Sequence, residues 1–449
     1  MNAGASQPAA PAATAKARVL GFWMCTALVV GNIIGIGIFV MPAALAPFGL
    51  NALTAWAITV VGCLFLALTF ANLARSYPHD DGPYAYTRRA FGEGTAFIAM
   101  WCYWVSTWVT NAVIAIGLVG YVSIFVPALN AEPWLKPLTA LAFLWFFVLV
   151  NVFGARGAGW MQLSTTLLKL VPQIAIIVLG LWILIDRPAA YLEHLPTTPA
   201  SLHAVIGAST IALFAMLGVE CAAIPAGLVH DPARTIPRAT IVGTLIAASI
   251  CVCISIVPML LIPQAELATS NAPFADLIGR YVGSGYGKLL AAFVVVSGLG
   301  ALNGWTLIVG EVTQSFARHG NFPAGLGKVN RYAAPARAFL LTGLVASIMM
   351  MMNYNQSMAS GFAFLSVVVT AANLPIYFTC SLGAFVLWRR GEIGHLDRRA
   401  LVWALFALLA FIYCAFVSIG IGLQSLLWAL VLGAVGVPVY LWSRRAQRL

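Results

Sequence analysis

Residues Gly31-Asn32-Ile33-Ile34-Gly35-Ile36-Gly37-Ile38-Phe39 interrupt the first long apolar stretch of the chain, which runs from Leu20 to Leu45. A glycine in the interior of a helix is roughly 1 kcal/mol less favourable than an alanine. A bilayer tolerates freed backbone groups only where they are buried in protein or line a cavity. The stretch therefore indicates a broken membrane helix whose backbone forms part of a binding site.

A second interruption, Gly218-Val219-Glu220, falls in the sixth apolar stretch. Paired broken helices are typical of transporters built from two inverted repeats, in which the substrate site lies where the breaks meet. One broken helix is weak evidence for such a fold, whereas two in matching places are much stronger. The pattern favours a transporter over a channel, because a channel needs no paired broken helices.

The composition is that of a polytopic membrane protein. Of 449 residues, 61% are hydrophobic and only 8% are charged. Many apolar runs exceed the length that crosses a bilayer. They predict an all-α membrane protein with about twelve transmembrane helices, at about residues 20–45, 50–73, 96–126, 137–153, 159–185, 204–229, 239–262, 286–316, 336–353, 360–388, 400–417 and 422–443.

The charge distribution predicts the orientation of these spans. Residues 1–18 are expected to form a disordered cytoplasmic tail, because this segment is rich in alanine and proline and has little to bury. With that tail inside, most of the 24 Lys and Arg residues fall on the inner side, as the positive-inside rule requires. Both termini are therefore predicted to be cytoplasmic in a multi-pass protein of the cell inner membrane. The net charge of +11 follows from this topology, and no nucleic-acid partner is expected, because the charges are scattered over loops.

The sequence contains no pattern that indicates a cofactor, a metal site or an enzyme. All eight cysteines fall inside predicted spans without zinc-like spacing, and we expect them to be packing residues. An intramembrane enzyme would need a nucleophile and a base or metal ligands in the spans. No histidine lies in the interior of a predicted span, and His203 lies at an edge.

Ionisable residues inside the spans are candidates for function, because the hydrocarbon disfavours charge. Lys169 is predicted about 15 Å deep in the fifth span. It could exchange a proton during transport or stay charged in place of a sodium ion, and the alternative is a structural lysine that holds carbonyls of the broken first helix. Glu220 is the counter-charge for a cationic substrate, or else it hydrogen-bonds loose amides where its helix resumes. Glu311, near Arg318, favours a salt bridge or an inner gate.

Trp305 differs from the many aromatic residues that serve as lipid anchors or packing. It follows Leu302-Asn303-Gly304, where small neighbours leave room for a cationic group against the indole face. In the third span, Tyr103, Thr107 and Asn111 are spaced one helical turn apart, and this polar stripe could bind a substrate head group. Interhelical hydrogen bonding is the alternative for Asn111.

At these residues the chain resembles the amino acid-polyamine-organocation superfamily, in particular the basic amino acid/polyamine antiporters typified by arginine:agmatine and putrescine:ornithine exchangers. The resemblance runs from about residue 17 to about residue 445 and rests on an ordered series of motifs. They are Gly31 to Phe39, Tyr84-Ala85-Tyr86, Arg88-Arg89, Phe91-Gly92, Gly218-Val219-Glu220, Asp231-Pro232, Ile236-Pro237-Arg238-Ala239, Ala272-Pro273-Phe274 and Gly304-Trp305-Thr306.

The resemblance implies a five-plus-five inverted repeat with discontinuous helices 1 and 6, followed by two more helices. The first repeat would cover residues 19–185 and the second residues 204–388. The added helices would cover residues 397–443, ahead of a cytoplasmic tail over 444–449.

The resemblance also implies the site residues. The α-carboxylate and the α-amine of the substrate would meet Asn32, Ile33, Gly35, Ile36, Gly37, Phe214 and Leu217. Its side chain would reach Ser106, Thr107, Asn111, Ile114, Trp305 and Val368. The gates fall on Phe214 toward the outside, on Trp305, and on Tyr103 with Glu220 and Ile376 farther in. Lys169, Glu220 and Tyr84 are the coupling or pH-response positions.

Three departures from the family pattern concern the substrate. Ile36 replaces a serine, Phe214 replaces a tryptophan gate, and Lys169 replaces a small apolar residue. The function implied is therefore exchange of basic amino acids or polyamines by alternating access, with antiport slightly favoured over symport. The alternative is a proton-coupled or exchange transporter of neutral amino acids that uses Lys169. The expected partners are the small-molecule substrate and the lipid bilayer, and the chain would act alone or as a homodimer.

Overall fold

The computed structural model describes residues 21–35, 37–77, 82–132, 134–153, 158–221, 229–318, 320–332, 334–352, 358–393 and 398–448. The expected tail over residues 1–18 and the candidate Ile36 lie outside these ranges. Within them the regular structure is almost entirely helical. This confirms the predicted all-α class.

Nine helices of the described part are long and apolar enough to cross a membrane. They are α3 (Asn51–Ser76), α5 (Glu93–Val122), α7 (Leu135–Val152), α8 (Ala158–Asp186), α11 (Pro232–Leu261), α14 (Ser284–Arg318), α16 (Met358–Arg389), α17 (Arg398–Ile419) and the run of α18 (Leu423–Ala434) into α19 (Gly436–Arg448). The chain is thus a multi-pass membrane protein. α19 continues to Arg448, so the segment predicted as a tail after residue 443 extends this helix.

The first predicted span is a broken helix. α1 (Phe22–Ile33) and α2 (Gly37–Leu45) are bent by 42° at the interruption, and as one span they would be a tenth. Two further apolar helices are shorter, α10 (Leu202–Ala215) and α15 (Ala336–Met352). These elements lie where the sequence pattern predicts the first, sixth and ninth spans.

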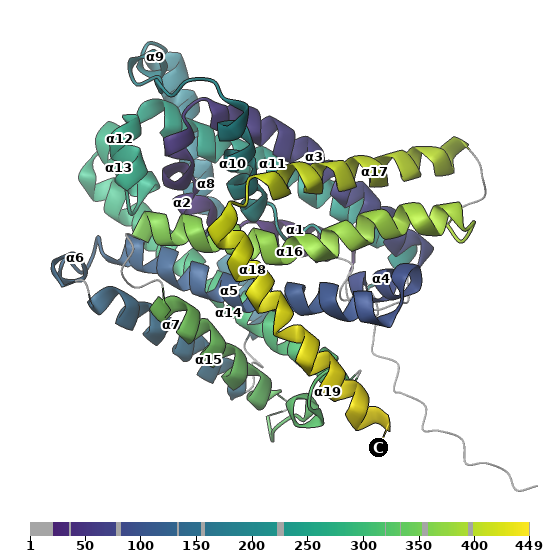
Figure 1. Ribbon diagram of the computed structural model, residues 1–449. Coiled ribbons are helices and arrows are strands. Elements are labelled where there is room, and N and C mark those ends of the chain that lie inside the picture. Colours follow the sequence, from purple (N-terminus) through teal and green to yellow (C-terminus); the bar gives the residue numbers. More distant parts are fainter. Residues whose placement is uncertain are drawn as a thin grey trace, which may run out of the picture.

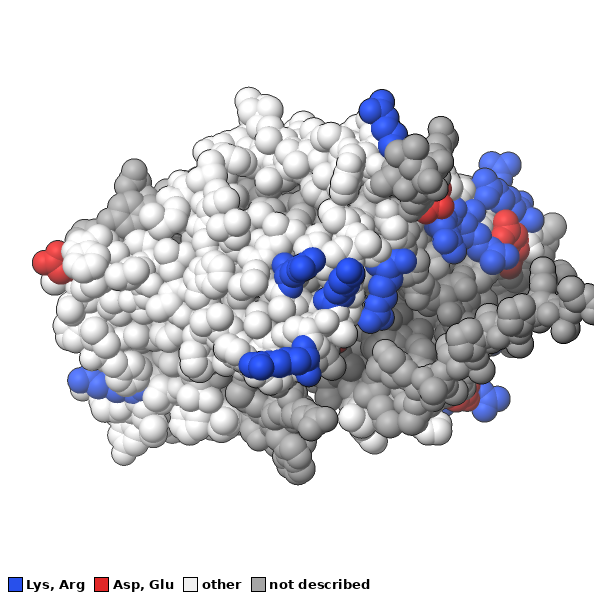
Figure 2. All heavy atoms as spheres, turned by 90° about the horizontal axis from the view of Figure 1, so that it is seen from below, with Lys and Arg blue, Asp and Glu red and all other residues white. Residues whose placement is uncertain are grey.

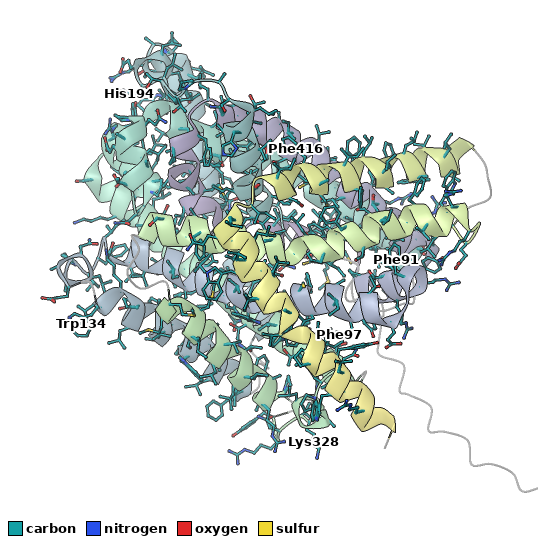
Figure 3. The ribbon with its side chains drawn as sticks, viewed as in Figure 1. Phe91, Phe97, Trp134, His194, Lys328 and Phe416 are labelled. Atoms are coloured by element: carbon teal, nitrogen blue, oxygen red, sulfur yellow. The ribbon has the colours of Figure 1, made fainter. Side chains whose placement is uncertain are left out.

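The long helices lie side by side, and short helices cover their ends (Figure 1). The short elements are η1 (Ala46–Phe48), α4 (Pro83–Phe91), α6 (Ala128–Ala131), α9 (Ala190–Glu193), α12 (Gln264–Thr269), α13 (Pro273–Tyr281) and η3 (Ala324–Gly327). In Figure 1, α4 lies at the right-hand end, and α6, α9, α12 and α13 lie at the left-hand end. The labelled side chains agree, because Trp134 and His194 lie at the left and Phe91 at the right (Figure 3).

The two ends differ in charge. Figure 2 shows Lys and Arg mainly over the centre and right of the face seen from below, toward the end that carries α4. At that end the Arg89 guanidinium donates to a Glu392 carboxylate oxygen at 2.7 Å and lies over the Tyr77 ring. These contacts join α4 to the turn that follows α16.

α5 is the most deeply buried of the long helices and packs against both α16 and α14. Two indole groups attach it to its neighbours. Trp104 Nε1 donates to the Thr313 hydroxyl of α14 at 2.7 Å, and Trp101 Nε1 donates to the Leu432 carbonyl of α18 at 2.9 Å. A buried donor that loses its partner is costly, so these bonds fix the position of α5.

Amide side chains anchor the second half of the broken first helix. Gln264 Nε2 of α12 donates to the Ala46 carbonyl of η1 at 2.8 Å and to the Thr198 hydroxyl at 2.6 Å. Asn51 Nδ2 donates to the Phe48 and Pro199 carbonyls, both at 2.9 Å. The end of α2 is therefore tied to α12 and to the loop before α10.

We expect Thr313→Val to lower the melting temperature, because it leaves the Trp104 N–H buried without a partner, at a cost of about 1–3 kcal/mol. Thr342→Val is the matched control, since the Thr342 hydroxyl bonds only to carbonyls of its own helix in the described part of the chain. Thermal unfolding of the detergent-purified variants measures the difference. Equal melting temperatures for the two variants would contradict the assigned role of the Trp104 bond.

Candidate functional site

The first helix break is stabilised by a buried lysine. α1 ends at Ile33, the Gly35 N–H donates to the Ile33 carbonyl at 3.0 Å, and the helical ladder is not continued. Lys169 Nζ of α8 donates to the Gly31 carbonyl at 3.3 Å, and Lys169 is only 2% exposed. The carboxyl end of a helix carries a partial negative charge and unpaired carbonyls. The lysine thus satisfies the end of the half-helix, which is the structural role considered for it from sequence.

The turn that follows α10, at the predicted second interruption, packs directly on the first break. α10 ends at Ala215 and a turn continues to Cys221, with Gly218 at a φ of +114°. A Cβ on Gly218 would lie 3.3 Å from the Cβ of Asn32 and 3.4 Å from the backbone nitrogen of Ile33. Glycine is needed here both for the positive φ and for this close approach.

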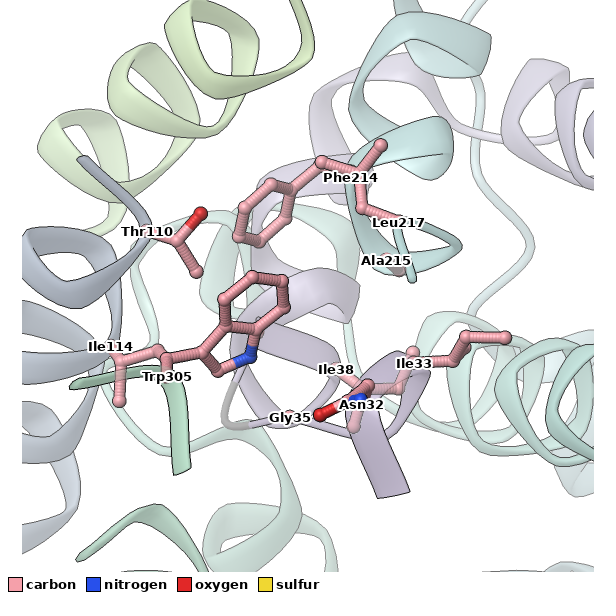
Figure 4. A pocket seen from close by; sticks show the side chains of 11 residues that line it. Asn32, Ile33, Gly35, Ile38, Thr110, Ile114, Phe214, Ala215, Leu217 and Trp305 are labelled. Carbon is pink, nitrogen blue, oxygen red and sulfur yellow. The ribbon is translucent and has the colours of Figure 1, made fainter. Parts of the chain in front are cut away.

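A small cavity lies between the two breaks (Figure 4). The Phe214 ring and the Trp305 indole face each other across it, and the broken first helix forms its floor. The cavity is lined by Asn32, Ile33, Gly35, Gly37, Ile38, Thr110, Ile114, Phe214, Ala215, Leu217 and Trp305. Its volume of about 30 Å³ has room for one or two water molecules.

Phe214 controls the size of this cavity. A Cβ on Gly37 would lie only 2.7 Å from Cε1 of the Phe214 ring, so the ring rests directly on the start of α2. Both Phe214 and Trp305 are 8% exposed. The cavity is too small for a molecule of amino-acid size, so binding of one requires lining groups such as these rings to move.

The structure brings most of the predicted substrate residues together. Asn32, Ile33, Gly35, Gly37, Ile114, Phe214, Leu217 and Trp305 line the cavity. Asn32 Nδ2 is buried and has no hydrogen-bond partner among the described residues. It is a donor available to a ligand.

Other predicted residues are buried beside the cavity and do not line it. Ser106, Thr107, Asn111 and Val368 are all at most 3% exposed and absent from its lining. The Thr107 hydroxyl donates to the Trp104 carbonyl within α5 at 2.7 Å. Thr110 was not predicted and does line the cavity. The signal was present, because residues 103, 107, 110 and 114 follow one face of a helix.

Glu220 lies in a buried polar cluster beyond the cavity. The carboxylate is 1% exposed and accepts a hydrogen bond from the Tyr377 hydroxyl of α16 at 2.7 Å. Tyr103 lies in electrostatic contact with the same carboxylate.

Tyr377 corrects the predicted third member of this group. The resemblance places that position at Ile376, whereas the hydroxyl that reaches Glu220 belongs to the next residue. Adjacent helical residues differ by about 100° in direction, so a shift of one position in the alignment selects the wrong side chain.

Tyr84 lies on α4, at the end of the molecule that carries the Arg89 contacts. Its hydroxyl donates to Glu93 at 3.1 Å and accepts from Asn321 Nδ2 at 3.2 Å. Burial raises the pKa of the Tyr84 hydroxyl above its usual value. The group therefore stays protonated at neutral pH and joins α4 to the start of α5 and to the segment after α14.

The remaining sequence candidates do not form a site. Glu311 is exposed on α14 and has a polar interaction. All eight cysteines are free, and all except Cys253 are buried. Within the described ranges, no three His, Cys, Asp or Glu residues are grouped so that they could hold a metal ion.

Comparison with known proteins gives consistent matches over nearly the whole chain. A profile described as amino acid permease matches residues 20–437. The cadaverine/lysine antiporter of Escherichia coli is 32% identical over 81% of this chain and 83% of its own. A putative arginine/ornithine antiporter of Bacillus subtilis is 30% identical over 94% of this chain and 96% of its own. The putrescine transporter PotE of Escherichia coli is 28% identical, with coverages of 95% and 96%.

We expect Gly218→Ala to destabilise the protein, because a non-glycine residue held in such a backbone region costs on the order of 1–3 kcal/mol. The new methyl group would also press on Asn32. Gly35→Ala, in the other break, is the matched control, since its Cβ would meet nothing within 4 Å. Thermal unfolding should show a lower melting temperature for Gly218→Ala alone. A loss of equal size in both variants would contradict the packing of one break on the other.

Proposed function

Because the chain belongs to the amino acid permease family, we propose that it exchanges basic amino acids or polyamines across the inner membrane by alternating access. The family consists of transporters and not of enzymes. The printed names of three relatives include antiporters of cadaverine and lysine and of arginine and ornithine, and a transporter of putrescine. Their similarity extends over most of both chains, which supports exchange of the same class of substrate.

One observation carries this proposal: the cavity lies where the break in the first helix meets the turn after α10, and two aromatic rings line it. The start of α2 offers free backbone N–H groups at the positive end of a helix, which suits a substrate carboxylate. Asn32 Nδ2 is a further donor on that side. The carbonyls at the ends of α1 and α10, including those of Ile33, Phe214 and Leu217, suit an ammonium group. Ile36 belongs to this proposed set from its place in the sequence.

The cationic end of the substrate would meet aromatic and acidic groups. The indole face of Trp305 attracts an ammonium or guanidinium group. Glu220, with Tyr103 and Tyr377, supplies the negative charge farther along. The hydroxyl and amide groups of Ser106, Thr107 and Asn111, with Ile114 and Val368, would surround the side chain between these points.

Gating follows from the size of the cavity. Phe214 is the proposed outer gate and Trp305 the proposed inner gate next to the cavity, because both buried rings line a cavity that is too small for an amino acid. Tyr103, Glu220 and Tyr377 form the proposed inner gate farther from it, with Tyr377 in place of Ile376. Tyr84 remains the proposed pH-response residue at the end that carries α4, through its hydrogen bonds to Glu93 and Asn321 and not through loss of its own proton.

The proposed topology has twelve transmembrane helices. Residues 19–185 and 204–388 form the two inverted repeats, residues 397–443 form the added helices, and both termini lie in the cytoplasm. The cluster of basic side chains at the α4 end supports this orientation through the positive-inside rule.

Lys169 decides between the proposed function and its alternative. As a fixed positive charge on the Gly31 carbonyl, it holds the break in place without a bound cation. If instead it releases a proton during the cycle, the chain could carry neutral amino acids with a proton gradient.

The proposed function predicts that labelled arginine enters proteoliposomes preloaded with arginine, lysine, cadaverine or putrescine, and not empty vesicles. Glu220→Gln should lower kcat/KM for the cationic substrate by about tenfold or more, because it removes the charge and keeps an acceptor for Tyr377. Initial rates of uptake at acidic and neutral pH measure both effects.

Two controls accompany this measurement. Protein-free vesicles report leakage, and vesicles preloaded with alanine report exchange of a neutral amino acid. If every cationic pair fails while alanine preload or a proton gradient drives alanine entry, the basic-substrate assignment is wrong and the Lys169 alternative holds.

A further inference from the structure

Polar side chains follow one another from the cavity toward Glu220 along the contact between α5 and α16. Thr110, which lines the cavity, donates to the Ser106 carbonyl at 2.7 Å. One turn deeper, Ser106 Oγ lies 3.1 Å from the side-chain oxygen of Asn373 on α16. Asn373 is in turn one helical turn from Tyr377, whose hydroxyl reaches Glu220. Asn373 therefore lies at a depth between the cavity and the Glu220 cluster.

The hydrogen bonds of Ser106 determine how the Asn373 amide is oriented. A serine hydroxyl has one proton. Ser106 Oγ is 2.7 Å from the Tyr103 carbonyl, which can only accept, so the proton goes there. The Asn373 group that faces Ser106 must then be the donor, which is the NH₂ end of the amide. The two ends of an amide are interchangeable in shape, and their orientation follows from the hydrogen-bond network.

This orientation leaves an acceptor without a partner. Asn373 is 2% exposed, and the atom at the far end of its amide has no hydrogen-bond partner among the residues described. With the NH₂ end on Ser106, that atom is the carbonyl oxygen. A buried oxygen without a donor costs free energy, and a passing ammonium or guanidinium group would satisfy it.

We propose that the Asn373 side-chain oxygen is a transient binding site for the cationic group of the substrate as this group moves between the Trp305 cavity and Glu220. This inference rests on the proposed function. It adds a residue that binds the cationic group of the substrate between the cavity and Glu220. The oxygen is neutral, so it binds the cation without holding it as strongly as a carboxylate does. Ser106 is a positioning residue, because it sets the orientation of the amide.

The inference predicts opposite results for two substitutions. Asn373→Leu removes the acceptor at similar volume, and we expect KM for lysine exchange to rise about tenfold, which corresponds to loss of one charge-assisted hydrogen bond. Asn373→Asp keeps an acceptor, and we expect KM at or below the wild-type value. The inhibition constant of norleucine, which lacks the terminal ammonium, should be unchanged in both variants. Initial rates of lysine–lysine exchange in proteoliposomes provide all of these values.

Ser381→Ala is the matched control. Ser381 also lies on α16 and is buried, and its hydroxyl has no partner in the described ranges. We expect KM for lysine to stay at the wild-type value in this variant. If Asn373→Leu does not yield a monodisperse protein, Asn373→Ala takes its place with the same expected rise in KM.

The outcomes separate the inference from the proposed function. If Asn373→Leu has the wild-type KM for lysine and the wild-type protein is active, the transient binding site at Asn373 is refuted and the proposed function still stands. An equal rise in KM for the Leu and Asp variants overturns the acceptor orientation. If wild-type protein exchanges neither lysine nor arginine nor cadaverine, the proposed function fails, and the inference fails with it.

Discussion

The packing of the turn after α10 on the break in the first helix is the constraint on which the rest of the structure depends. In a bilayer, backbone groups without partners are very unfavourable, and each break frees several of them. Gly218 allows its segment to lie against Asn32 and Ile33, so that each break covers part of the other. Lys169 satisfies a carbonyl at the end of α1. The cavity lies where these contacts bring the two segments together.

The surrounding helices are held in place around this cavity by specific contacts. α5 crosses beside the cavity and is fixed by indole hydrogen bonds to α14 and α18. α16 packs along α5 and brings Asn373 and Tyr377 to the polar side chains that lead away from the cavity. The buried side chains of Ser106, Asn373, Tyr377 and Glu220 thus follow one another away from the cavity. The relatives' names and this route both point to cationic substrates.

Much of this architecture could be predicted from sequence. The glycine pattern at residues 31–37 and at Gly218 identifies both breaks, because glycine in a membrane helix needs a local reason. The deviations arise where helical direction decides. Thr110 lines the cavity whereas its neighbour Asn111 does not, and Tyr377 reaches Glu220 whereas Ile376 does not. Such one-residue differences depend on how each helix is rotated about its axis relative to its neighbours. When several faces of a helix are packed, its apolar residues do not reveal this rotation. The Asn373 network depends on a contact between distant segments and has no local signal.

The amide bonds of Gln264 and Asn51 have a mechanical consequence. They join the end of α2 to α12 and to the loop over residues 198–201, and they do so through uncharged groups. Any tilt of α2 that widens the cavity toward that end either breaks the two hydrogen bonds to the Ala46 and Phe48 carbonyls or moves α12, the start of α3 and the loop together with α2. Neutral amides neither titrate in the physiological range nor respond strongly to ionic strength. This hydrogen-bonded linkage would therefore keep the same stiffness at acidic pH or at high salt concentration.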